Sequence, residues 1–361
     1  MNASSLFDLR LLDFFKKTLR RGVPGAQGPF AALAALDFQR RQAQRRWSAA
    51  RAGRVVPPVL IASVTRRCNL DCAGCYSKAL RPGSGPELDD DRFMALFEEA
   101  VELGVGVIML AGGEPLLRRS LLERAASLPG VFLPVFTNGT LVDRAALELF
   151  ARSRLVPVFS IEGEAEDTAD RRGSGIHEAV LAAASVLRGR GAGFGLSITL
   201  TSRNADSAMS RPFLESLGGL GASVIFLIEY VPAAPGTDHL VLGAAQKAAL
   251  AEPGRFDDLS FGVIQLPGDE EAYGGCLAAG RGFLHLAADG RVEACPFAPF
   301  SDSTAATASL AEALDSPLMR AIRERHAELT ETRGGCALWN KRGWVASLGA
   351  CASRPLEAGV A

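Results

Sequence analysis

Short apolar runs alternate with amphipathic segments through the middle of the chain, from Pro58 to about residue 236. The runs are rich in Val, Ile and Phe and are mostly apolar throughout, which is typical of strands buried on both faces of a parallel sheet. We expect these strands at Val59–Val64, Val105–Leu110, Val131–Phe136, Val158–Ile161, Phe194–Leu200 and Val224–Ile228.

The amphipathic segments between the runs predict crossover helices. The clearest, Arg92–Leu103, begins after the acidic run Asp89–Asp91 and ends at Gly104, which are common start and stop signals. Further helices are expected at Leu116–Leu128, Arg144–Arg152, Glu178–Arg190 and Pro212–Leu217. This alternation predicts an α/β fold with right-handed crossovers. Periodicity alone does not separate a partial barrel from an open doubly wound sheet.

The alternation is absent on both sides of this core. Before it we expect a helix from Leu6 to about Arg21, which packs on the core or contacts a partner or a membrane surface. A second helix, Phe30–Arg51, is expected to present its arginines to solvent. After the core, a helix at Ala244–Ala251 lies in a connecting stretch.

The C-terminal part begins with a hairpin pattern. Asp289-Gly290, a strong turn signal, separates the short runs Phe283–Leu286 and Arg291–Ala294. A later helix is expected from Ser316-Pro317 to about Thr330. We therefore divide the chain into an N-terminal helical extension (1–57), a core (58–236), a connecting segment (237–275), a C-terminal hairpin-plus-helix unit (276–351) and a tail (352–361).

Composition narrows the classes of function. The 361 residues include 39 Lys and Arg against 40 Asp and Glu, so net charge gives no general attraction to nucleic acid. With 48% hydrophobic residues the chain can bury a substantial core. There is no apolar run of the ~20 residues that a membrane span needs, and no signal-peptide pattern at the N-terminus. We expect a cytoplasmic location.

The seven cysteines fall into two groups. Cys68, Cys72 and Cys75 lie within eight residues, directly after the first expected strand. Three thiolates on one loop can converge on one metal centre, and three is one fewer than tetrahedral zinc or a fully protein-ligated cubane requires. Such a site can accept a substrate or cofactor at the open position. The alternative is a zinc site that a remote residue completes, for which His177 is the best candidate.

The Cys-x3-Cys-x2-Cys loop after a first strand resembles the signature of radical S-adenosylmethionine (radical SAM) enzymes. In that family the three cysteines bind a [4Fe-4S] cluster, and the amino and carboxylate groups of SAM bind its fourth iron. A second motif follows in register, because Gly112-Gly113-Glu114 ends the second strand and is similar to the family motif that binds the SAM amino group. The resemblance implies a partial (β/α)6 TIM-type barrel.

Later strand ends are also similar to family motifs. Thr137–Thr140 resembles a Thr-Asn-Gly motif, and Ser160 and Glu162 resemble a Ser-x-Asp-Gly motif with Glu in place of Asp. Many relatives have an aromatic residue before the third cysteine, where this chain has Gly74. Thr199 and Asn204 are further candidates to line the SAM site. The resemblance implies cofactor contacts from Tyr76, Gly112, Gly113, Glu114, Asn138, Ser160, Glu162, Arg172 and Ser197.

The C-terminal cysteines resemble a second family pattern. Cys276, Gly290 and Cys295 have the Cys-x13-Gly-x4-Cys spacing that opens the SPASM and twitch extensions of radical SAM enzymes, which carry auxiliary clusters. Cys336 is the expected third ligand, and Cys351 is either a fourth ligand or a free thiol. The cysteines suffice for one auxiliary [4Fe-4S] cluster. A structural zinc ribbon and buried thiols are the alternatives.

The resemblance implies a class of reaction but no particular catalytic side chain. An electron from a flavodoxin or ferredoxin enters the cluster, SAM is cleaved reductively, and a 5′-deoxyadenosyl radical abstracts hydrogen from the substrate. An auxiliary cluster favours oxidation or cross-linking of a peptide or small molecule. The alternatives are an epimerase or C-methylating enzyme, and a non-catalytic iron–sulfur or zinc protein that binds a partner. Candidate substrate contacts are Arg203, Glu229 and Tyr230.

Overall fold

The computed structural model describes residues 8–9, 11–13, 29–81, 85–266, 273–330 and 336–348. Most of the expected helix Leu6–Arg21 lies outside these residues, as do Cys351 and the tail 352–361. No helix within the described ranges is both long and apolar enough to cross a membrane.

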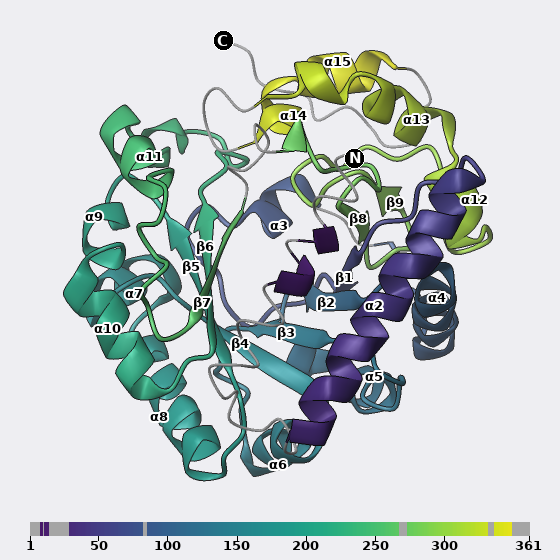
Figure 1. The fold of residues 1–361 in the computed structure, drawn as a ribbon. Coiled ribbons are helices and arrows are strands. Elements are labelled where there is room, and N and C mark those ends of the chain that lie inside the picture. The colour runs from purple at the N-terminus through teal and green to yellow at the C-terminus, as the bar shows by residue number, and fades with distance from the viewer. Residues whose placement is uncertain are drawn as a thin grey trace.

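One sheet of nine strands forms the centre of the molecule, in the order β7-β6-β5-β4-β3-β2-β1-β8-β9. Its curled shape, with helices on the outer side, is a half-barrel (Figure 1). All neighbours are parallel except β8 and β9. The expected partial α/β barrel is confirmed. The strands are β1 Val59–Thr65, β2 Val107–Gly112, β3 Leu133–Thr137, β4 Leu155–Ile161, β5 Gly195–Leu200, β6 Val224–Glu229, β7 Gly262–Leu266, β8 Phe283–Leu286 and β9 Val292–Glu293.

Helices follow the strands and cover the outer face of the sheet. Helix α4 lies close to its expected position. It begins after Asp89, whose side chain accepts from the Arg92 N–H, and it ends at Gly104, whose backbone is in the left-handed region. The core helices are α3 Tyr76–Leu80, α4 Asp90–Leu103, α5 Arg119–Ala125, α6 Arg144–Arg152, α7 Ala165–Arg172, α8 Ile176–Gly189, α9 Ala205–Ala208, α10 Arg211–Leu220 and α11 Ala244–Leu250, with short 3-10 turns η1 Pro115–Arg118 and η2 Asp238–Leu240.

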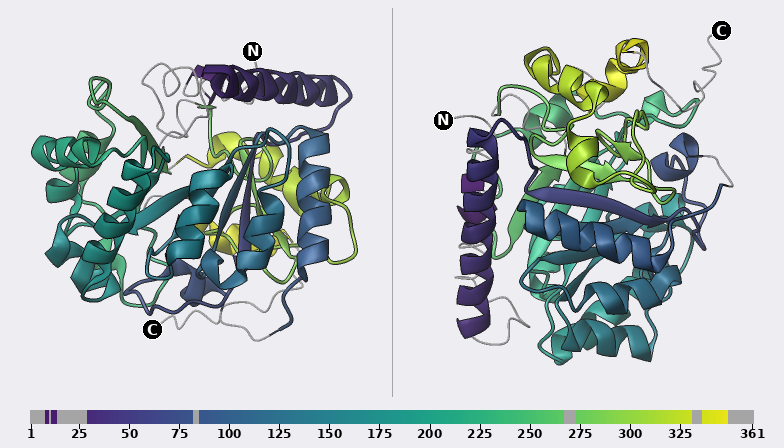
Figure 2. Two further views of the ribbon diagram at one scale, coloured as in Figure 1. Left: turned by 90° about the horizontal axis from the view of Figure 1, so that it is seen from below. Right: turned by 90° about the vertical axis from the view of Figure 1, so that its right-hand side faces the viewer.

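The C-terminal helices pack beside the hairpin at one edge of the sheet (Figures 1 and 2). Here β8 pairs in parallel with β1, with Val59 opposite Phe283, so the hairpin extends the barrel sheet. The expected helix from Ser316 ends earlier than predicted and continues as a 3-10 turn. The elements are α12 Leu310–Leu314, α13 Pro317–Glu324, η4 His326–Glu328, α14 Ala337–Asn340 and α15 Arg342–Ser347.

Two expectations for the core are corrected. The connecting segment contains an edge strand, β7, which pairs with β6 and was not predicted. The expected helix Leu116–Leu128 is a 3-10 turn followed by the short helix α5. Its first turn is tight because Pro115 begins it and the Glu114 side chain accepts from the Leu116 N–H.

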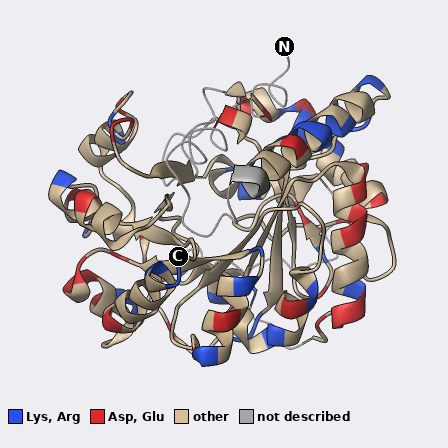
Figure 3. Cartoon of the chain, turned by 60° about the horizontal axis from the view of Figure 1, so that its bottom comes forward, with Lys and Arg blue, Asp and Glu red and all other residues tan. Residues whose placement is uncertain are grey.

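Helix α2, Pro29–Arg51, lies across the amino ends of the first strands, at the opposite end of the barrel from α3 (Figure 2). Its basic residues are visible in Figure 3, where both signs of charge are mixed over the outer helices. The expectation that all its arginines face solvent is wrong for Arg46, which is 5% exposed. Arg46 donates to the Gly104 carbonyl and pairs with Asp8 at 2.6 Å. Gln42 donates to the carbonyls of Val101 and Val105 at 2.7 and 2.9 Å. The helix therefore satisfies the carbonyls at the end of α4.

We predict that Gln42→Ala lowers the free energy of unfolding by about 1–3 kcal/mol, because it removes the donor of buried carbonyls. Equilibrium unfolding in urea measures the change. Arg41→Ala on the same helix is the matched control, since its ion pair with Asp37 is more than half exposed and should contribute little. Equal stability of Gln42→Ala and the unmodified chain would refute this docking role.

Candidate cluster and cofactor site

Cys68, Cys72 and Cys75 lie on the loop that joins the carboxyl end of β1 to α3, and all three are half-buried free thiols. They are close enough for their charges to interact. Burial raises the pKa of Cys68 and of Cys72, and a charge on Cys75 raises both further. Arg172 and Arg171 oppose the shift at Cys72. The Leu70 N–H donates to Cys68 Sγ at 3.5 Å. The loop thus gathers three sulfurs beside two guanidinium groups.

Gly112 and Gly113 are glycines because the end of β2 touches the segment that leads into this loop. A Cβ on Gly112, whose φ is +131°, would lie 2.3 Å from the Thr65 carbonyl oxygen. A Cβ on Gly113 would lie 2.0 Å from the Arg67 carbonyl oxygen. Backbone bonds use the same contact, since Gly113 N donates to Thr65 O at 2.7 Å and Glu114 N to Arg67 O at 2.8 Å. The Gly-Gly pair fixes the chain just before Cys68.

Glu114 is fully buried and joins the ends of β2 and β3. Its Oε1 accepts from the Thr137 hydroxyl at 2.7 Å and from the Leu116 N–H at 3.1 Å. Its Oε2 accepts from the Asn138 N–H at 2.8 Å. Burial raises the pKa of Glu114, and these bonds oppose the shift. The carboxylate therefore holds strand ends together, and its expected contact with a SAM amino group stays a prediction.

The Thr137–Thr140 turn holds the cysteine loop from the β3 side. Asn138 Nδ2 donates to Asn69 Oδ1 at 2.9 Å and lies 4.0 Å from Cys68 Sγ. Asn69 Nδ2 in turn donates to the Thr140 hydroxyl at 2.7 Å. Asn69 was not singled out from the sequence, although it stands directly after the first cysteine. Its two amide bonds make it the link between loop and turn.

At the end of β4, Glu162 is 1% exposed and pairs with both Arg171 and Arg172. Arg172 Nε donates to Glu162 Oε1 at 2.6 Å, and the Thr199 N–H donates to Oε2 at 3.1 Å. Two guanidinium groups face one carboxylate, so the pair of arginines has one positive charge in excess next to Cys72. Such an excess favours an anionic group on a ligand of the loop. Arg171 was missed as a site residue, whereas Arg172 was predicted.

The remaining expected site residues are polar groups at the ends of β4 and β5 and the three candidate substrate contacts. Ser160 and Ser197 face one another across β4 and β5, with their hydroxyls 3.0 Å apart. Asn204 binds the Glu162 carbonyl and the Thr201 hydroxyl. Of the candidate substrate contacts, Glu229 pairs with Lys247 at 3.0 Å, Arg203 is exposed and Tyr230 is buried.

Tyr76 contacts the C-terminal part of the chain. Its ring packs edge-on against Phe297 with the centroids 4.7 Å apart, between Cys75 and the segment after Cys295. Burial raises the pKa of Tyr76 to about 12, in the field of Arg81 and of both cysteines. Tyr76 therefore lies at the boundary between the two cysteine groups, and its expected cofactor contact stays a prediction.

The chain folds Cys276, Cys295 and Cys336 together, and all three are buried free thiols. Burial raises the pKa of Cys295 well above its usual range, and a hydrogen bond and charge from Cys336, then the charge of Cys276, add to the shift. The Ala278 N–H donates to Cys276 Sγ at 3.5 Å, and the Trp339 N–H donates to Cys336 Sγ at 3.4 Å. Hydrogen bonds to sulfur are among the features that set the reduction potential of an iron–sulfur cluster.

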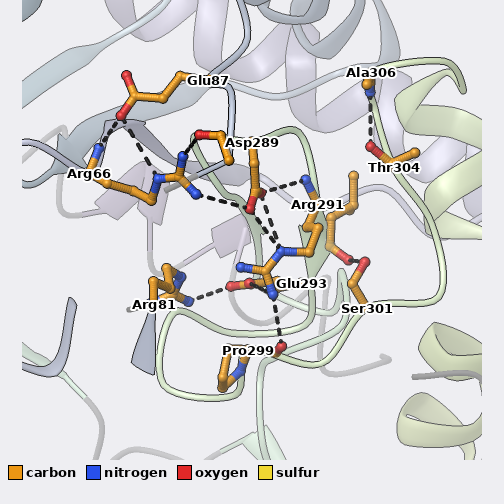
Figure 4. A network of polar contacts seen from close by, with 12 residues as sticks. Arg66, Arg81, Glu87, Asp289, Arg291, Glu293, Pro299, Ser301, Thr304 and Ala306 are labelled. Atoms are coloured by element: carbon orange, nitrogen blue, oxygen red, sulfur yellow. Dashed lines mark hydrogen bonds and ion pairs between the residues drawn. The ribbon is translucent and has the colours of Figure 1, made fainter. Parts of the chain in front are cut away.

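A network of buried and half-buried charges joins the segments around the two cysteine groups (Figure 4). Arg66, just before Cys68, pairs with Asp289 at the hairpin turn at 3.6 Å. Arg81, just after α3, pairs with Glu293 on β9, and it donates to the Pro296 carbonyl at 2.7 Å. Both flanks of the first cysteine loop are thereby fixed to the hairpin.

Glu293 is the centre of this network and is fully buried. Burial raises the pKa of Glu293, but Arg81 and His285 outweigh burial and hold it at about 2. His285 Nδ1 lies 2.7 Å from Glu293, and its Nε2 lies 2.8 Å from the Ser63 hydroxyl on β1. This Ser-His-Glu arrangement is inaccessible to solvent, so it joins β1, β8 and β9 rather than acting on a substrate.

Each cysteine group offers thiols as donors, and thiolates are the ligands of iron–sulfur clusters. Zinc also accepts thiolates, roughly 3.8 Å apart in a tetrahedral site. Among the described residues no three His, Cys, Asp or Glu side chains are arranged to hold a single metal ion. The zinc alternatives, including a site that His177 completes, stay predictions.

Fold and site together define a class: a partial α/β barrel with a three-cysteine loop at the carboxyl end of its first strand, where barrels of this type bind ligands. The model of the radical SAM superfamily matches residues 62–204, which span the strands and loops described above. Residues 62–204 are a radical SAM domain.

Curated relatives are similar over part of the chain. Fe-coproporphyrin III synthase of Methanosarcina barkeri is 34% identical over 151 residues, which cover 41% of this chain and 38% of the relative. PqqA peptide cyclase of Rhizobium meliloti is 34% identical over 124 residues, 33% of each protein. The chain thus spans about a third to two fifths of the length of these relatives.

Solved structures are similar over more of the chain. Streptococcus suis SuiB superposes with a TM-score of 0.63 at 14% identity, covering 89% of this chain and 83% of SuiB. Native anSMEcpe with bound AdoMet superposes with a TM-score of 0.57 at 15% identity, covering 80% of this chain and 94% of that structure. At this identity the likeness shows a shared fold.

We predict that Gly113→Ala lowers the amount of iron bound after anaerobic reconstitution, because the new methyl group would displace the Arg67 carbonyl and the cysteine loop with it. Iron and sulfide analysis and the visible absorbance measure the loss. Gly189→Ala, with open space around the added methyl group, is the matched control. Full iron content in Gly113→Ala would contradict the role assigned to this contact.

We predict that Arg81→Met destabilises the chain by about 3–5 kcal/mol, since the buried Glu293 would keep only its pair with the half-buried Arg291 at 3.3 Å and its bond to His285. Urea unfolding measures the loss. The double variant Arg81→Met, Glu293→Gln should regain part of it, because the charge is gone while an acceptor for His285 remains. A double variant no more stable than the single one would show that the ion pair is not the cause.

Proposed function

We propose that the chain is a radical SAM enzyme in which Cys68, Cys72 and Cys75 hold a [4Fe-4S] cluster with one iron left for SAM. The observation that supports this most directly is that three separate strand ends hold the loop: Gly113 at β2, the Asn138 turn at β3 and Arg171 after β4, whose carbonyl accepts from the Ala73 N–H at 2.9 Å. When bound, the cluster and SAM supply an electron and a 5′-deoxyadenosyl radical that abstracts hydrogen.

The residues of the chain orient these groups. The two glycines allow the backbone before Cys68 to lie against β2, and Glu114 fixes the neighbouring strand end. Arg171 and Arg172 supply the excess positive charge for the carboxylate of SAM, and Glu162 holds both guanidinium groups in place. Ser160 and Ser197 add hydroxyl groups at the ends of β4 and β5.

We further propose an auxiliary [4Fe-4S] cluster on Cys276, Cys295 and Cys336, with Cys351 or a ligand on the remaining iron. Three buried thiols at one place, each accepting a backbone N–H bond, support this assignment. It favours oxidation or cross-linking as the outcome. A peptide is the proposed substrate, because PqqA peptide cyclase is among the curated relatives. A flavodoxin or ferredoxin is the proposed electron donor.

We predict that the reconstituted chain binds roughly eight irons, two cubanes of four each, and converts SAM to methionine and 5′-deoxyadenosine under a strong reductant. Cys68→Ala should lose roughly half the iron and all SAM cleavage. Cys276→Ala should also lose roughly half the iron but keep measurable cleavage, because its site is separate. Chromatography of the products, with iron analysis of each variant, measures both. Zinc in place of iron, or no SAM cleavage with any reductant, would refute the proposal.

A further inference from the structure

Tyr230 lies directly after β6, and its ring packs on the cysteine loop. Its backbone N–H donates to the Leu200 carbonyl at 2.9 Å, and the residue is 2% exposed. A Cβ added to Gly74 would lie 2.3 Å from the Tyr230 hydroxyl oxygen and 3.0 Å from Cζ. The phenol therefore fills the side-chain space of residue 74, between the second and third cysteines.

The backbone conformation of Gly74 also disfavours a larger residue at this position. Its φ is +66°, a left-handed conformation that glycine adopts without cost and other residues adopt at about 1–2 kcal/mol. The turn and the phenol together require glycine at this position. Tyr230 thus supports the loop between Cys72 and Cys75 from the β6 side, next to the Ala73 N–H that donates to the Arg171 carbonyl.

The hydroxyl of Tyr230 has no hydrogen-bond partner among the described residues, although it is buried. Leaving such a group unpaired costs about 1–3 kcal/mol. A hydrophobic ring of the same shape, phenylalanine, would fill the space without this cost. A ligand that binds at the loop would supply the missing partner.

A second buried donor without a partner in the described ranges points to the same ligand. Arg171 Nε is unpaired, and the Arg171 carbonyl accepts from the N–H of Ala73, the residue before Gly74. Ala73 and Gly74 are adjacent in the loop. Ala73 contacts Arg171 and Gly74 contacts Tyr230, and each of these two has a buried donor without a partner in the described ranges. The excess positive charge of Arg171 and Arg172 over Glu162 calls for a ligand rich in acceptors.

We propose that the Tyr230 hydroxyl donates a hydrogen bond to an acceptor atom of SAM, while its ring supports Gly74 of the cysteine loop. The assignment rests on the proposed function, because SAM is the ligand proposed for the open iron. It makes Tyr230, and not Tyr76, the tyrosine that binds the cofactor. The two parts of the side chain have separate roles, so they are separable by substitution.

Tyr230→Phe tests the hydroxyl. The ring stays on Gly74, so iron content and the absorbance of the reconstituted cluster should match those of the unmodified chain. The dissociation constant for SAM, measured by equilibrium dialysis, should rise about 2- to 13-fold, the loss of one hydrogen bond. The change that SAM causes in the electron paramagnetic resonance signal of the reduced cluster should require correspondingly more SAM.

Tyr273→Phe is the matched control, because it removes the hydroxyl of another buried tyrosine outside the cysteine loop and should leave SAM affinity unchanged. Unchanged affinity in Tyr230→Phe, or a loss of affinity in Tyr76→Phe alone, would overturn the assignment. Failure of the unmodified chain to bind a cluster or SAM would overturn the proposed function instead, so the two failures are distinguishable.

A pair of variants tests the ring contact. Gly74→Ala should lower the iron content, because its methyl group meets the Tyr230 oxygen. Adding Tyr230→Phe removes that oxygen, and the nearest remaining atom would be Cζ at 3.0 Å, so part of the iron content should return. Equal iron content in the single and double variants would show that Tyr230 does not limit residue 74.

Discussion

The structure depends on holding in place an irregular loop that has no secondary structure of its own. Residues 66–75 carry three half-buried thiols between β1 and α3, and a loop of this kind has few backbone bonds to itself. Neighbouring strand ends supply the missing contacts. The tightest is Gly113 against the Arg67 carbonyl, where there is no room for a single added carbon atom. Because the parallel strands end at one edge of the sheet, each can reach the loop from a different direction.

The same constraint explains why so many charges are buried at the hairpin. The C-terminal cysteines are separated from the first group by about two hundred residues, so the chain must fix two sites relative to each other. Backbone pairing of β8 with β1 does part of this. The buried Arg81–Glu293 pair, together with His285 and Ser63, also fixes the hairpin to β1 and to the end of α3. Burying an ion pair rarely adds much net stability, but breaking it is costly, so the pair makes one placement of the hairpin strongly preferred.

The sequence patterns predicted the sheet and the two cysteine groups but only some of the residues that contact them. The spacing of Cys68, Cys72 and Cys75 and the register of Gly112-Gly113 could be seen along the chain because each is local. The edge strand β7 was missed because a five-residue run with Gln265 in it does not stand out from a connecting stretch. The burial of Arg46 was missed because its partners, Gly104 and Asp8, belong to other elements. Periodicity assigns an arginine to a face and cannot show which carbonyls that face meets.

Gly74 and Tyr230 show the same limit at the site itself. A glycine before the third cysteine looks like the loss of a side chain when the loop is considered alone. The structure shows that the space is filled by Tyr230, 156 positions further along the chain, at the end of the last strand to reach the loop. The small and the large residue are complementary, and neither is interpretable without the other. A tyrosine there leaves a polar atom in a buried place, and buried polar atoms are retained where something binds them. The loop's composition is therefore a consequence of its neighbours on the sheet as much as of its ligands.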